Sequence, residues 1–178
     1  MNITIIGTGY VGLVTGACFA ELGNSVTCID INPEIIKNLK KSKVPFYEPG
    51  LEDLVKKNLI NQNLKFTTSY NVGCKNDIFF ICVDTPDDGK GSPNLNSLNS
   101  VIKKLKQTIK RDAILVLKST LPIGTNRLIS DSIEKHFLPK KINIDVCSNP
   151  EFLKEGSAIS DFFYPDRIIL ATPNNSSR

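Results

Sequence analysis

Two carboxylates stand four residues apart in the segment NPEFLKEGSA, residues 149–158. If this segment is helical, Glu151 and Glu155 lie on one face, with roughly 5–6 Å between their Cβ atoms. Asn149 is suited to cap such a helix and Pro150 to begin it, so we predict a short helix here. Glu151 in the first turn would interact favourably with the helix dipole. A carboxylate pair can supply general acid–base catalysis, but the same pattern is typical of a solvated helix face.

A second group of residues with chemistry to offer lies in ITIIGTGYVG, residues 3–12. Three glycines follow a short apolar strand and open a helix. Gly7 permits a tight turn out of the strand, Gly9 lets the backbone approach a pyrophosphate, and Gly12 lets the helix pack close to the sheet. The N-terminus of the helix offers unpaired N–H groups and the positive end of its dipole. The arrangement predicts a dinucleotide-binding site.

Asp30 follows the second predicted strand, about 20 residues beyond the glycines. A carboxylate at this point accepts hydrogen bonds from the adenine ribose hydroxyls and repels a 2′-phosphate. The purely structural alternative is a glycine-rich turn before an amphipathic helix, and the presence of Asp30 argues against it. We therefore predict NAD rather than NADP as the cofactor.

These residues are positioned by strand-length apolar runs that alternate with segments of helical period. The predicted strands are residues 3–6, 26–29, 64–67, 78–83, 113–117, 144–147 and 167–171. The predicted helices, besides the short one after Asn149, are residues 10–22, 33–41, 51–58, 98–110 and 125–137. This alternation predicts an α/β fold of the Rossmann type, a doubly wound and mostly parallel sheet with helices on both faces.

Four candidate residues come directly after predicted strands, namely Asp30, Thr85, Thr120 and Glu151. Ligands of open α/β sheets bind outside the carboxyl ends of the strands. We therefore expect these side chains to converge on one edge of the sheet, beside the glycine turn.

The composition argues against several other classes of protein. A chain of 178 residues is enough for one well-filled domain. Its net charge of +4 comes largely from lysine pairs spread along the chain, which is unlike the concentrated basic surface of a nucleic-acid-binding protein. His136 is the only histidine, so we expect no His-rich metal site. No apolar run reaches about 18 residues, so no membrane span is expected.

The cysteines indicate a reducing compartment. There are five, an odd number, and no two have C-x-x-C spacing. Cys28, Cys82 and Cys147 sit in apolar strand-like runs, Cys18 sits in a helical one, and Cys74 lies in a loop or at a helix end. Cysteines in such positions behave as small buried hydrophobic residues. We therefore expect a cytoplasmic protein without structural disulfides.

Five motifs occur in an order that resembles one enzyme family. They are GTGYVGL at residues 7–13, YEPGL at 47–51, CVDTP at 82–86, KSTLPIGT at 118–125 and NPEFLKEGSAISDFFYPDRI at 149–168. Together they resemble the N-terminal half of the UDP-glucose 6-dehydrogenases, within the UDP-glucose/GDP-mannose dehydrogenase family. The resemblance covers essentially the whole chain and is less specific for the sugar than for the family.

The resemblance implies an enzyme of polysaccharide biosynthesis that oxidises the C6 alcohol of UDP-glucose to UDP-glucuronate with two NAD+. A cysteine in a later domain captures the aldehyde, a second hydride transfer leaves a thioester, and water hydrolyses it. None of the five cysteines lies in the GGxCFPKD-like motif that carries this thiol.

We therefore expect residues 1–178 to form the NAD-binding domain of a longer enzyme, without its central and C-terminal UDP-sugar-binding domains. Such a chain should bind NAD but should not turn over UDP-glucose by itself. The resemblance also implies a homodimer formed through the central region, so the present residues alone could be monomeric.

The matching motifs assign roles to individual residues. Those that match the family's cofactor site are Gly7, Gly9, Tyr10, Val11, Gly12, Asp30, Thr85, Thr120 and Glu155. Those that match its sugar-nucleotide site are Glu151, Phe152, Leu153 and Glu155. Among the matches to the catalytic site, Glu155 corresponds to a general acid–base in thioester hydrolysis and Thr120 to a hydroxyl that positions water. Glu151 corresponds to a neighbouring acid that tunes the site.

One position departs from the family, and two alternatives stay open. Ile35 stands where the family usually carries a Lys or Arg that supports the adenosine end of NAD, so we predict weaker NAD binding than in such relatives. The first alternative is a dehydrogenase for GDP-mannose or a UDP-N-acetylhexosamine. The second is a non-catalytic dinucleotide-binding module, which would need neither Glu155 nor Thr120.

Overall fold

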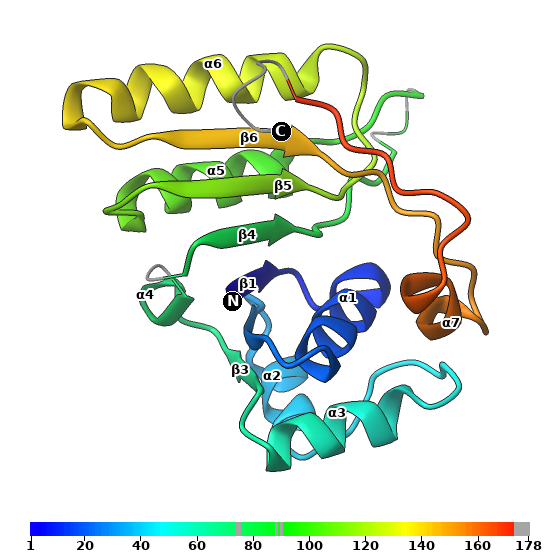
Figure 1. The fold of residues 1–178 in the computed structure, drawn as a ribbon. Helices are drawn as coiled ribbons and strands as arrows, with labels where there is room; N and C mark the ends of the chain where they lie inside the picture. The colour runs from blue at the N-terminus through cyan, green and yellow to red at the C-terminus, as the bar shows by residue number, and fades with distance from the viewer. Residues whose placement is uncertain (74–75, 88, 90, 173–178) are drawn as a thin grey trace.

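A six-stranded sheet, all parallel, forms the centre of the molecule, with the strand order β3-β2-β1-β4-β5-β6 (Figure 1). This computed structural model describes residues 1–73, 76–87, 89 and 91–172. The strands are β1 (Asn2–Ile6), β2 (Ser25–Ile29), β3 (Leu64–Thr67), β4 (Ile78–Ile81), β5 (Ala113–Leu117) and β6 (Ile144–Ser148). The predicted doubly wound Rossmann-type fold is confirmed, with a sheet that is parallel throughout.

Helices cover both faces of the sheet. They are α1 (Tyr10–Glu21), α2 (Pro33–Leu39), α3 (Leu51–Ile60), α4 (Tyr70–Gly73), α5 (Asn96–Thr108), α6 (Thr125–Phe137) and α7 (Ala158–Phe163), with a 3-10 turn at Leu138–Lys140. Helices α1, α2, α3 and α7 pack in one apolar cluster with one face. Helices α5 and α6 pack in a second cluster with the other.

Strand β4, at the centre of the sheet, is apolar in every position because both of its faces are covered. Phe80, together with Cys82 just beyond the strand, packs in the cluster that contains α1. Phe79 and Ile81 pack in the cluster that contains α5 and α6. Because successive side chains point to opposite faces, a strand covered on both sides is typically a nearly continuous apolar run.

The register of the sheet brings the carboxyl ends of five strands into one row. Ile6 of β1 pairs with Ile29 of β2 and with Ile81 of β4, Ile81 pairs with Leu117, and Leu117 pairs with Ser148. The residues that come immediately after this row are Gly7, Asp30, Cys82, Lys118 and Asn149. These five residues therefore begin the loops at a single edge of the sheet.

Two predicted elements are wrong. Residues 149–157 form no helix: they are irregular up to Lys154 and turn at residues 155–157, and α7 begins only at Ala158. Residues 167–171 form no strand beyond a single antiparallel bridge between Ser148 and Ala171. The sequence prediction also missed α4, a helix of four residues.

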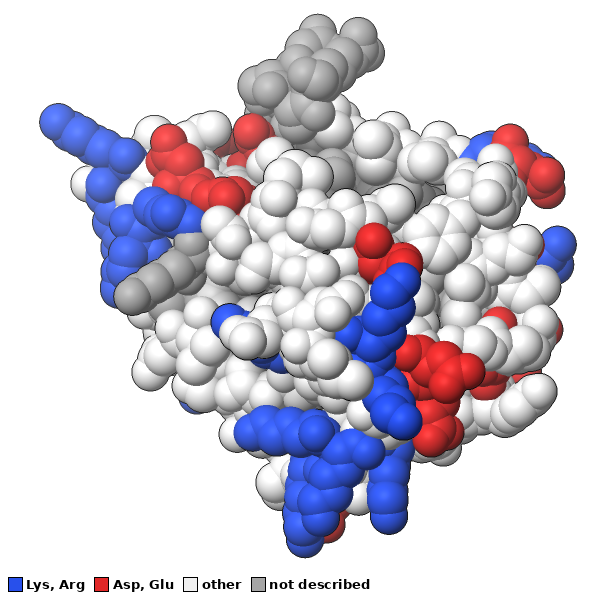
Figure 2. All heavy atoms as spheres, turned by 60° about the horizontal axis from the view of Figure 1, so that its bottom comes forward, with Lys and Arg blue, Asp and Glu red and all other residues white. Residues whose placement is uncertain are grey.

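Charged side chains are distributed over the face seen in Figure 2. Basic side chains stand there in several separate groups, and acidic side chains lie beside most of them. Among the described residues, Lys57 forms an ion pair with Glu21. On this face, the basic side chains of the described residues are therefore interspersed with acidic ones.

Candidate functional site

The turn between β1 and α1 is held by backbone contacts that only glycine permits. Gly7 has a φ of 95°, and a Cβ placed there would lie 2.5 Å from the carbonyl oxygen of Cys82. A Cβ at Gly12 would lie 2.0 Å from the carbonyl oxygen of Gly7. The Gly7 N–H also donates to the carbonyl of Ile29, at 2.8 Å. The turn is therefore locked between β2, β4 and the first turn of α1.

Gly9 differs from these two glycines because the space above it is open. The nearest atom to a Cβ placed there is Asp84 Oδ1, at 3.9 Å. Gly9 is the N-cap of α1 and has no side chain to satisfy the first N–H groups of the helix, which have no partner within the helix either. A phosphate can therefore approach this end of α1 closely, as a dinucleotide requires.

Asp30 lies beside the same turn. Its Oδ2 accepts hydrogen bonds from the N–H and the hydroxyl of Thr8, both at 2.8 Å, and its Oδ1 accepts from Asn32 N–H, at 2.9 Å. The side chain is half-buried. The carboxylate is thus held at the end of β2 next to the glycine turn, where an adenine ribose is bound in folds of this kind. The open glycine and this acid together fit NAD.

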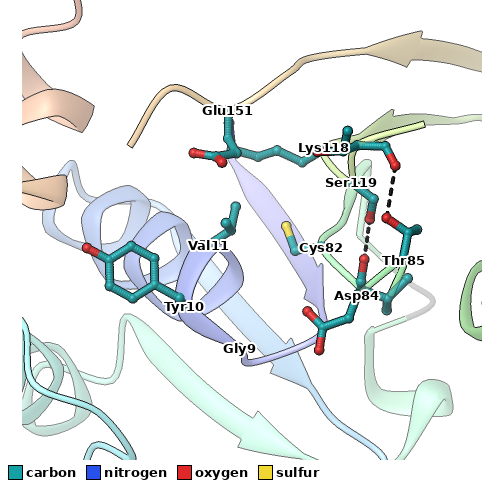
Figure 3. A pocket seen from close by; sticks show the side chains of 11 residues that line it. Gly9, Tyr10, Val11, Cys82, Asp84, Thr85, Lys118, Ser119 and Glu151 are labelled. Carbon is teal, nitrogen blue, oxygen red and sulfur yellow. Dashed lines mark hydrogen bonds between the residues drawn. The ribbon is translucent and has the colours of Figure 1, made fainter. Parts of the chain in front are cut away.

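A pocket of about 170 Å³ opens at this edge of the sheet (Figure 3). Six of the residues predicted for the site line it, namely Gly9, Tyr10, Val11, Thr85, Thr120 and Glu151. The other lining residues are Cys82, Val83, Asp84, Lys118 and Ser119. The pocket therefore unites the start of α1 with the loops that follow β4, β5 and β6.

Two hydroxyl groups tie the loops after β4 and β5 together. Thr85 Oγ1 donates to the carbonyl of Thr120, at 2.9 Å, and Ser119 Oγ donates to the carbonyl of Val83, at 2.6 Å. Both bonds join residues of the pocket wall. The wall is therefore fixed by bonds between the two loops as well as by the sheet beneath it.

Lys118 is a pocket residue that the sequence reasoning missed. Its side chain is 9% exposed, and its Nζ donates to Asn149 Oδ1, at 3.2 Å. Burial lowers the pKa of Lys118, while the Glu151 carboxylate nearby acts in the opposite direction. Lys118 lies in the KSTLPIGT motif, and its position directly after a buried strand is the signal that could have identified it.

The acid pair is split by the irregular backbone of residues 149–157. Glu151 lines the pocket, and its Oε2 accepts from Leu153 N–H, at 2.7 Å. Glu155 and Phe152 are exposed and lie outside the residues that line the pocket, and Leu153 packs against the core. Glu155 still lies at the same edge, because its two neighbours in the chain, Lys154 and Gly156, contact Tyr10 and Glu48.

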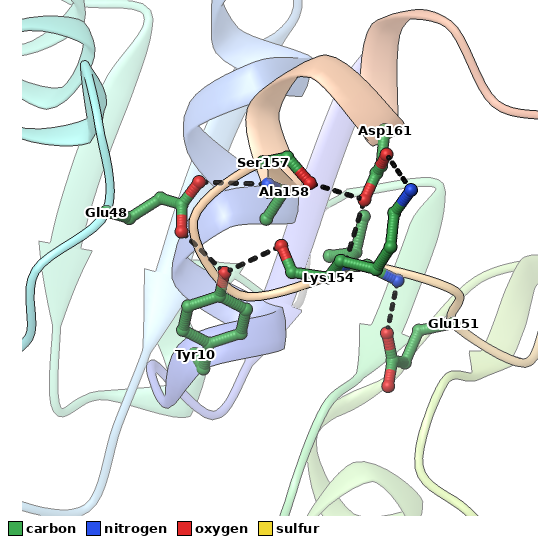
Figure 4. A network of polar contacts seen from close by, with 8 residues as sticks. Tyr10, Glu48, Glu151, Lys154, Ser157, Ala158 and Asp161 are labelled. Carbon is green, nitrogen blue, oxygen red and sulfur yellow. Dashed lines mark hydrogen bonds and ion pairs between the residues drawn. The ribbon is translucent and has the colours of Figure 1, made fainter.

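Glu48 is the second residue that the sequence reasoning missed. It belongs to the turn before α3 and is only 5% exposed. Its carboxylate accepts hydrogen bonds from the Tyr10 hydroxyl, from Gly156 N–H and from Ala158 N–H, at 2.6, 2.8 and 2.9 Å (Figure 4). Glu48 lies within the YEPGL motif, and nothing local in the sequence indicates partners more than 100 residues away.

Neither a metal centre nor a membrane span is found in the part of the chain that the structure describes. Within residues 1–73, 76–87, 89 and 91–172, no three His, Cys, Asp or Glu side chains are grouped so as to hold a metal ion. No helix among the same residues has the length and apolar content for a membrane crossing. Cys18, Cys28, Cys82 and Cys147 are free thiols and are buried, and Cys74 lies outside the described residues.

Comparisons with known proteins agree on one family. The chain is 48% identical, over 178 residues, to UDP-glucose 6-dehydrogenase YwqF of Bacillus subtilis. The alignment covers 99% of this chain and 40% of that protein. The structure of a UDP-glucose dehydrogenase from Pyrobaculum islandicum superposes with a TM-score of 0.89 at 36% identity, covering 97% of this chain and 40% of the other.

A ternary complex of GDP-mannose dehydrogenase from Pseudomonas aeruginosa superposes with a TM-score of 0.90 at 31% identity, covering 97% of this chain and 41% of the other. The chain thus spans about 40% of the length of the relatives that it matches. Residues 1–178 match the description "UDP-glucose/GDP-mannose dehydrogenase family, NAD binding domain". The chain therefore belongs to the UDP-glucose/GDP-mannose dehydrogenase family, as its NAD-binding domain.

Proposed function

We propose that residues 1–178 are the NAD-binding domain of a UDP-glucose 6-dehydrogenase, an enzyme that converts UDP-glucose to UDP-glucuronate with two NAD+. The observation that carries the proposal is the pocket in which Gly9, Tyr10 and Val11 meet Thr85, Thr120 and Glu151. We further propose that domains beyond this one bind the sugar nucleotide and form a homodimer. Four buried free thiols support a reducing compartment, and we assign the protein to the cytoplasm.

In this proposal the residues at the edge of the sheet bind and orient the reactants. Bound NAD+ supplies the hydride acceptor for the oxidation at C6. The N–H groups at the start of α1 bind the pyrophosphate, and Asp30 accepts from the adenine ribose. The hydroxyls of Thr85 and Thr120 face the nicotinamide half, where Thr120 also orients a water molecule.

The acids of the irregular segment complete the proposed site. Glu151 contributes negative charge at the pocket wall opposite Lys118. Glu155 takes the proton of the water that hydrolyses the covalent sugar intermediate, and Phe152 and Leu153 meet the sugar nucleotide through their backbone. Because Glu155 is exposed here, its partner groups must come from the substrate or from other parts of the enzyme.

Titration of the chain with NAD+ and NADP+ tests the cofactor half of the proposal. We expect saturable binding of NAD+ and at least about tenfold weaker binding of NADP+, because the Asp30 carboxylate repels a 2′-phosphate. Calorimetry measures both affinities on one preparation. Absence of NAD+ binding, or equal affinity for the two nucleotides, would contradict the proposal.

The catalytic half is tested in the longer protein that we propose carries this domain. We expect two NADH per UDP-glucose consumed, and a large loss of turnover in Glu155→Gln. Parallel assays with GDP-mannose and a UDP-N-acetylhexosamine distinguish the second candidate function, which the similarity to a GDP-mannose dehydrogenase supports. The higher identity to a UDP-glucose enzyme, 48% against 31%, favours UDP-glucose.

A further inference from the structure

A buried polar network connects three segments that are distant in the sequence. Its centre is the carboxylate of Glu48, which comes from the turn before α3. Glu48 Oε2 accepts from the Tyr10 hydroxyl, at 2.6 Å, and from Gly156 N–H, at 2.8 Å, while Oε1 accepts from Ala158 N–H, at 2.9 Å. Figure 4 shows Glu48 beside the loop that leads into α7, and Tyr10 below that loop. The glycine turn and the acid-bearing segment therefore share one anchor.

The chemistry of the network requires a carboxylate at its centre. Burial by itself raises the pKa of Glu48, but the hydrogen bonds from Tyr10 and the backbone N–H groups outweigh it and lower the pKa overall. Burial and the neighbouring Glu48 raise the pKa of Tyr10, so its hydroxyl stays a donor. The amide of glutamine has one oxygen acceptor and one NH₂ donor. With glutamine at position 48, the NH₂ group would therefore face the backbone N–H of either Gly156 or Ala158, and neither of the two can accept a hydrogen bond.

The network touches the cofactor site through Tyr10. Tyr10 is the first residue of α1 and lines the pocket together with Gly9 and Val11. The Tyr10 hydroxyl also lies 3.4 Å from the carbonyl of Lys154, so it contacts the acid-bearing segment directly. Further along, Asp161 accepts from Lys154 N–H, at 2.9 Å, which closes the loop onto α7. The position of Glu155, between Lys154 and Gly156, is therefore set from both sides.

We propose that Glu48 is a positioning residue that couples the dinucleotide turn to residues 154–158. The same carboxylate orients the Tyr10 ring at the pocket and fixes the backbone that carries Glu155. Ordering either part orders the other, and by thermodynamic reciprocity NAD binding at the turn stabilises the loop as much as the loop favours NAD. The coupling to NAD rests on the proposed function, whereas the positioning of the loop does not.

Amide hydrogen exchange measured by NMR tests the positioning without any cofactor. In Glu48→Gln we expect Gly156 and Ala158 to exchange about tenfold faster or more, while amides in β1 and β4 keep their protection, because local opening is governed by local bonds. Tyr10→Phe removes one bond and leaves the charge, so we expect a smaller change and a folded protein. Glu52→Gln and Tyr47→Phe make the same chemical changes at exposed positions and should change neither amide.

Titration with NAD+ on the same variants tests the coupling. In the wild type we expect NAD+ to slow the exchange of Gly156 and Ala158, and in Glu48→Gln we expect a several-fold loss of NAD+ affinity together with loss of that response. Unchanged exchange in Glu48→Gln, or in Tyr10→Phe if the first variant does not fold, overturns the positioning role. NAD+ binding that leaves both amides unaffected in the wild type overturns the coupling. Failure of the wild type to bind NAD+ contradicts the proposed function and the coupling. The positioning role of Glu48 is then decided by the amide exchange measured without cofactor.

Discussion

The glycine turn at residues 7–12 and the acid-bearing segment at residues 149–157 lie at the same edge of the sheet but are held in different ways. The turn is fixed by contacts between backbone atoms, with Gly7 against Cys82 and Gly12 against Gly7. The segment has no repeating backbone hydrogen bonds of helix or strand. Side chains from elsewhere hold it instead, chiefly Glu48 and Asp161.

The difference teaches where a substitution should act. A side chain added at Gly7 or Gly12 would collide with backbone atoms and should lower the stability of the fold itself. A change among the anchors of the segment removes polar bonds at the surface of a sheet that stays intact, so it should affect geometry and binding more than folding. The predictions below test this contrast, beginning with the largest expected effect.

Gly12→Ala is the severest test of the turn. The added Cβ would lie 2.0 Å from the carbonyl oxygen of Gly7, which belongs to the backbone and cannot rotate away. We expect the free energy of unfolding to fall by about 3 kcal/mol or more. Urea denaturation followed by circular dichroism measures the change. A loss below about 1 kcal/mol would show that α1 can move away from the sheet and would break the contrast.

Gly9→Ala is the matched control, two residues from the start of the same turn. The added Cβ meets nothing closer than Asp84 Oδ1, at 3.9 Å, and the φ of Gly9 is −66°, which alanine adopts without strain. We expect a change in the free energy of unfolding within about 0.5 kcal/mol. NAD+ affinity should fall by about tenfold or more, because the methyl group would occupy the approach of the pyrophosphate. Wild-type NAD+ affinity in this variant would contradict the assigned phosphate position.

The contrast also explains which features were predictable from the sequence. The turn follows from Gly7, Gly9 and Gly12 because each contact is local or lies against the neighbouring strand. The order of strands and helices follows from apolar periodicity, since burial on both faces imposes it. The convergence of Thr85, Thr120 and Glu151 follows from the position of strand ends in a parallel sheet. All of these depend on short-range patterns.

The segment was mispredicted because its determinants are distant. Asn149, Pro150 and Glu151 have the residue types of a helix start, and these N-terminal preferences favoured a helix. In the structure Asn149 instead accepts from Lys118 and donates to the carbonyl of Ile169, at 3.0 Å, while Glu151 closes a turn onto Leu153. These tertiary bonds override the local preference. Glu48 was missed for the same reason, because two of its partners, Gly156 and Ala158, are more than 100 residues away in the sequence.

Acid should weaken the anchor of the segment before it affects the turn. The pKa of Glu48 in the folded protein lies below the ordinary value of 4.5, so its stabilising contribution is fully present above about pH 4.5. As the pH falls through the lower folded-state pKa, this contribution is lost. Glu21, whose pKa is lowered by Lys57 and Asn58, acts in the same direction.

Thermal unfolding of wild type and Glu48→Gln between pH 6 and pH 3 measures the contribution of the Glu48 charge to stability. We expect the difference in melting temperature between the two proteins to shrink as the pH falls, because the wild type loses the charge that the variant never had. A constant difference over this range would show that Glu48 is not the titrating anchor. Glu52→Gln, an exposed neighbour in the first turn of α3, should follow the wild type.

The smallest expected effect concerns whether α2, which carries Ile35, forms part of the cofactor site. Ile35 packs against the core from α2, and the nearest lysine in the helix, Lys37, pairs with Glu34 at 3.5 Å. Ile35→Lys can keep its methylene stem on the core and extend its ammonium outward. We expect NAD+ to bind a few-fold more tightly, with the gain falling as salt is raised because the charge is exposed. Ile35→Gln separates charge from shape: an equal gain in both variants would assign the effect to packing, and no gain in Ile35→Lys would show that α2 lies outside the cofactor site.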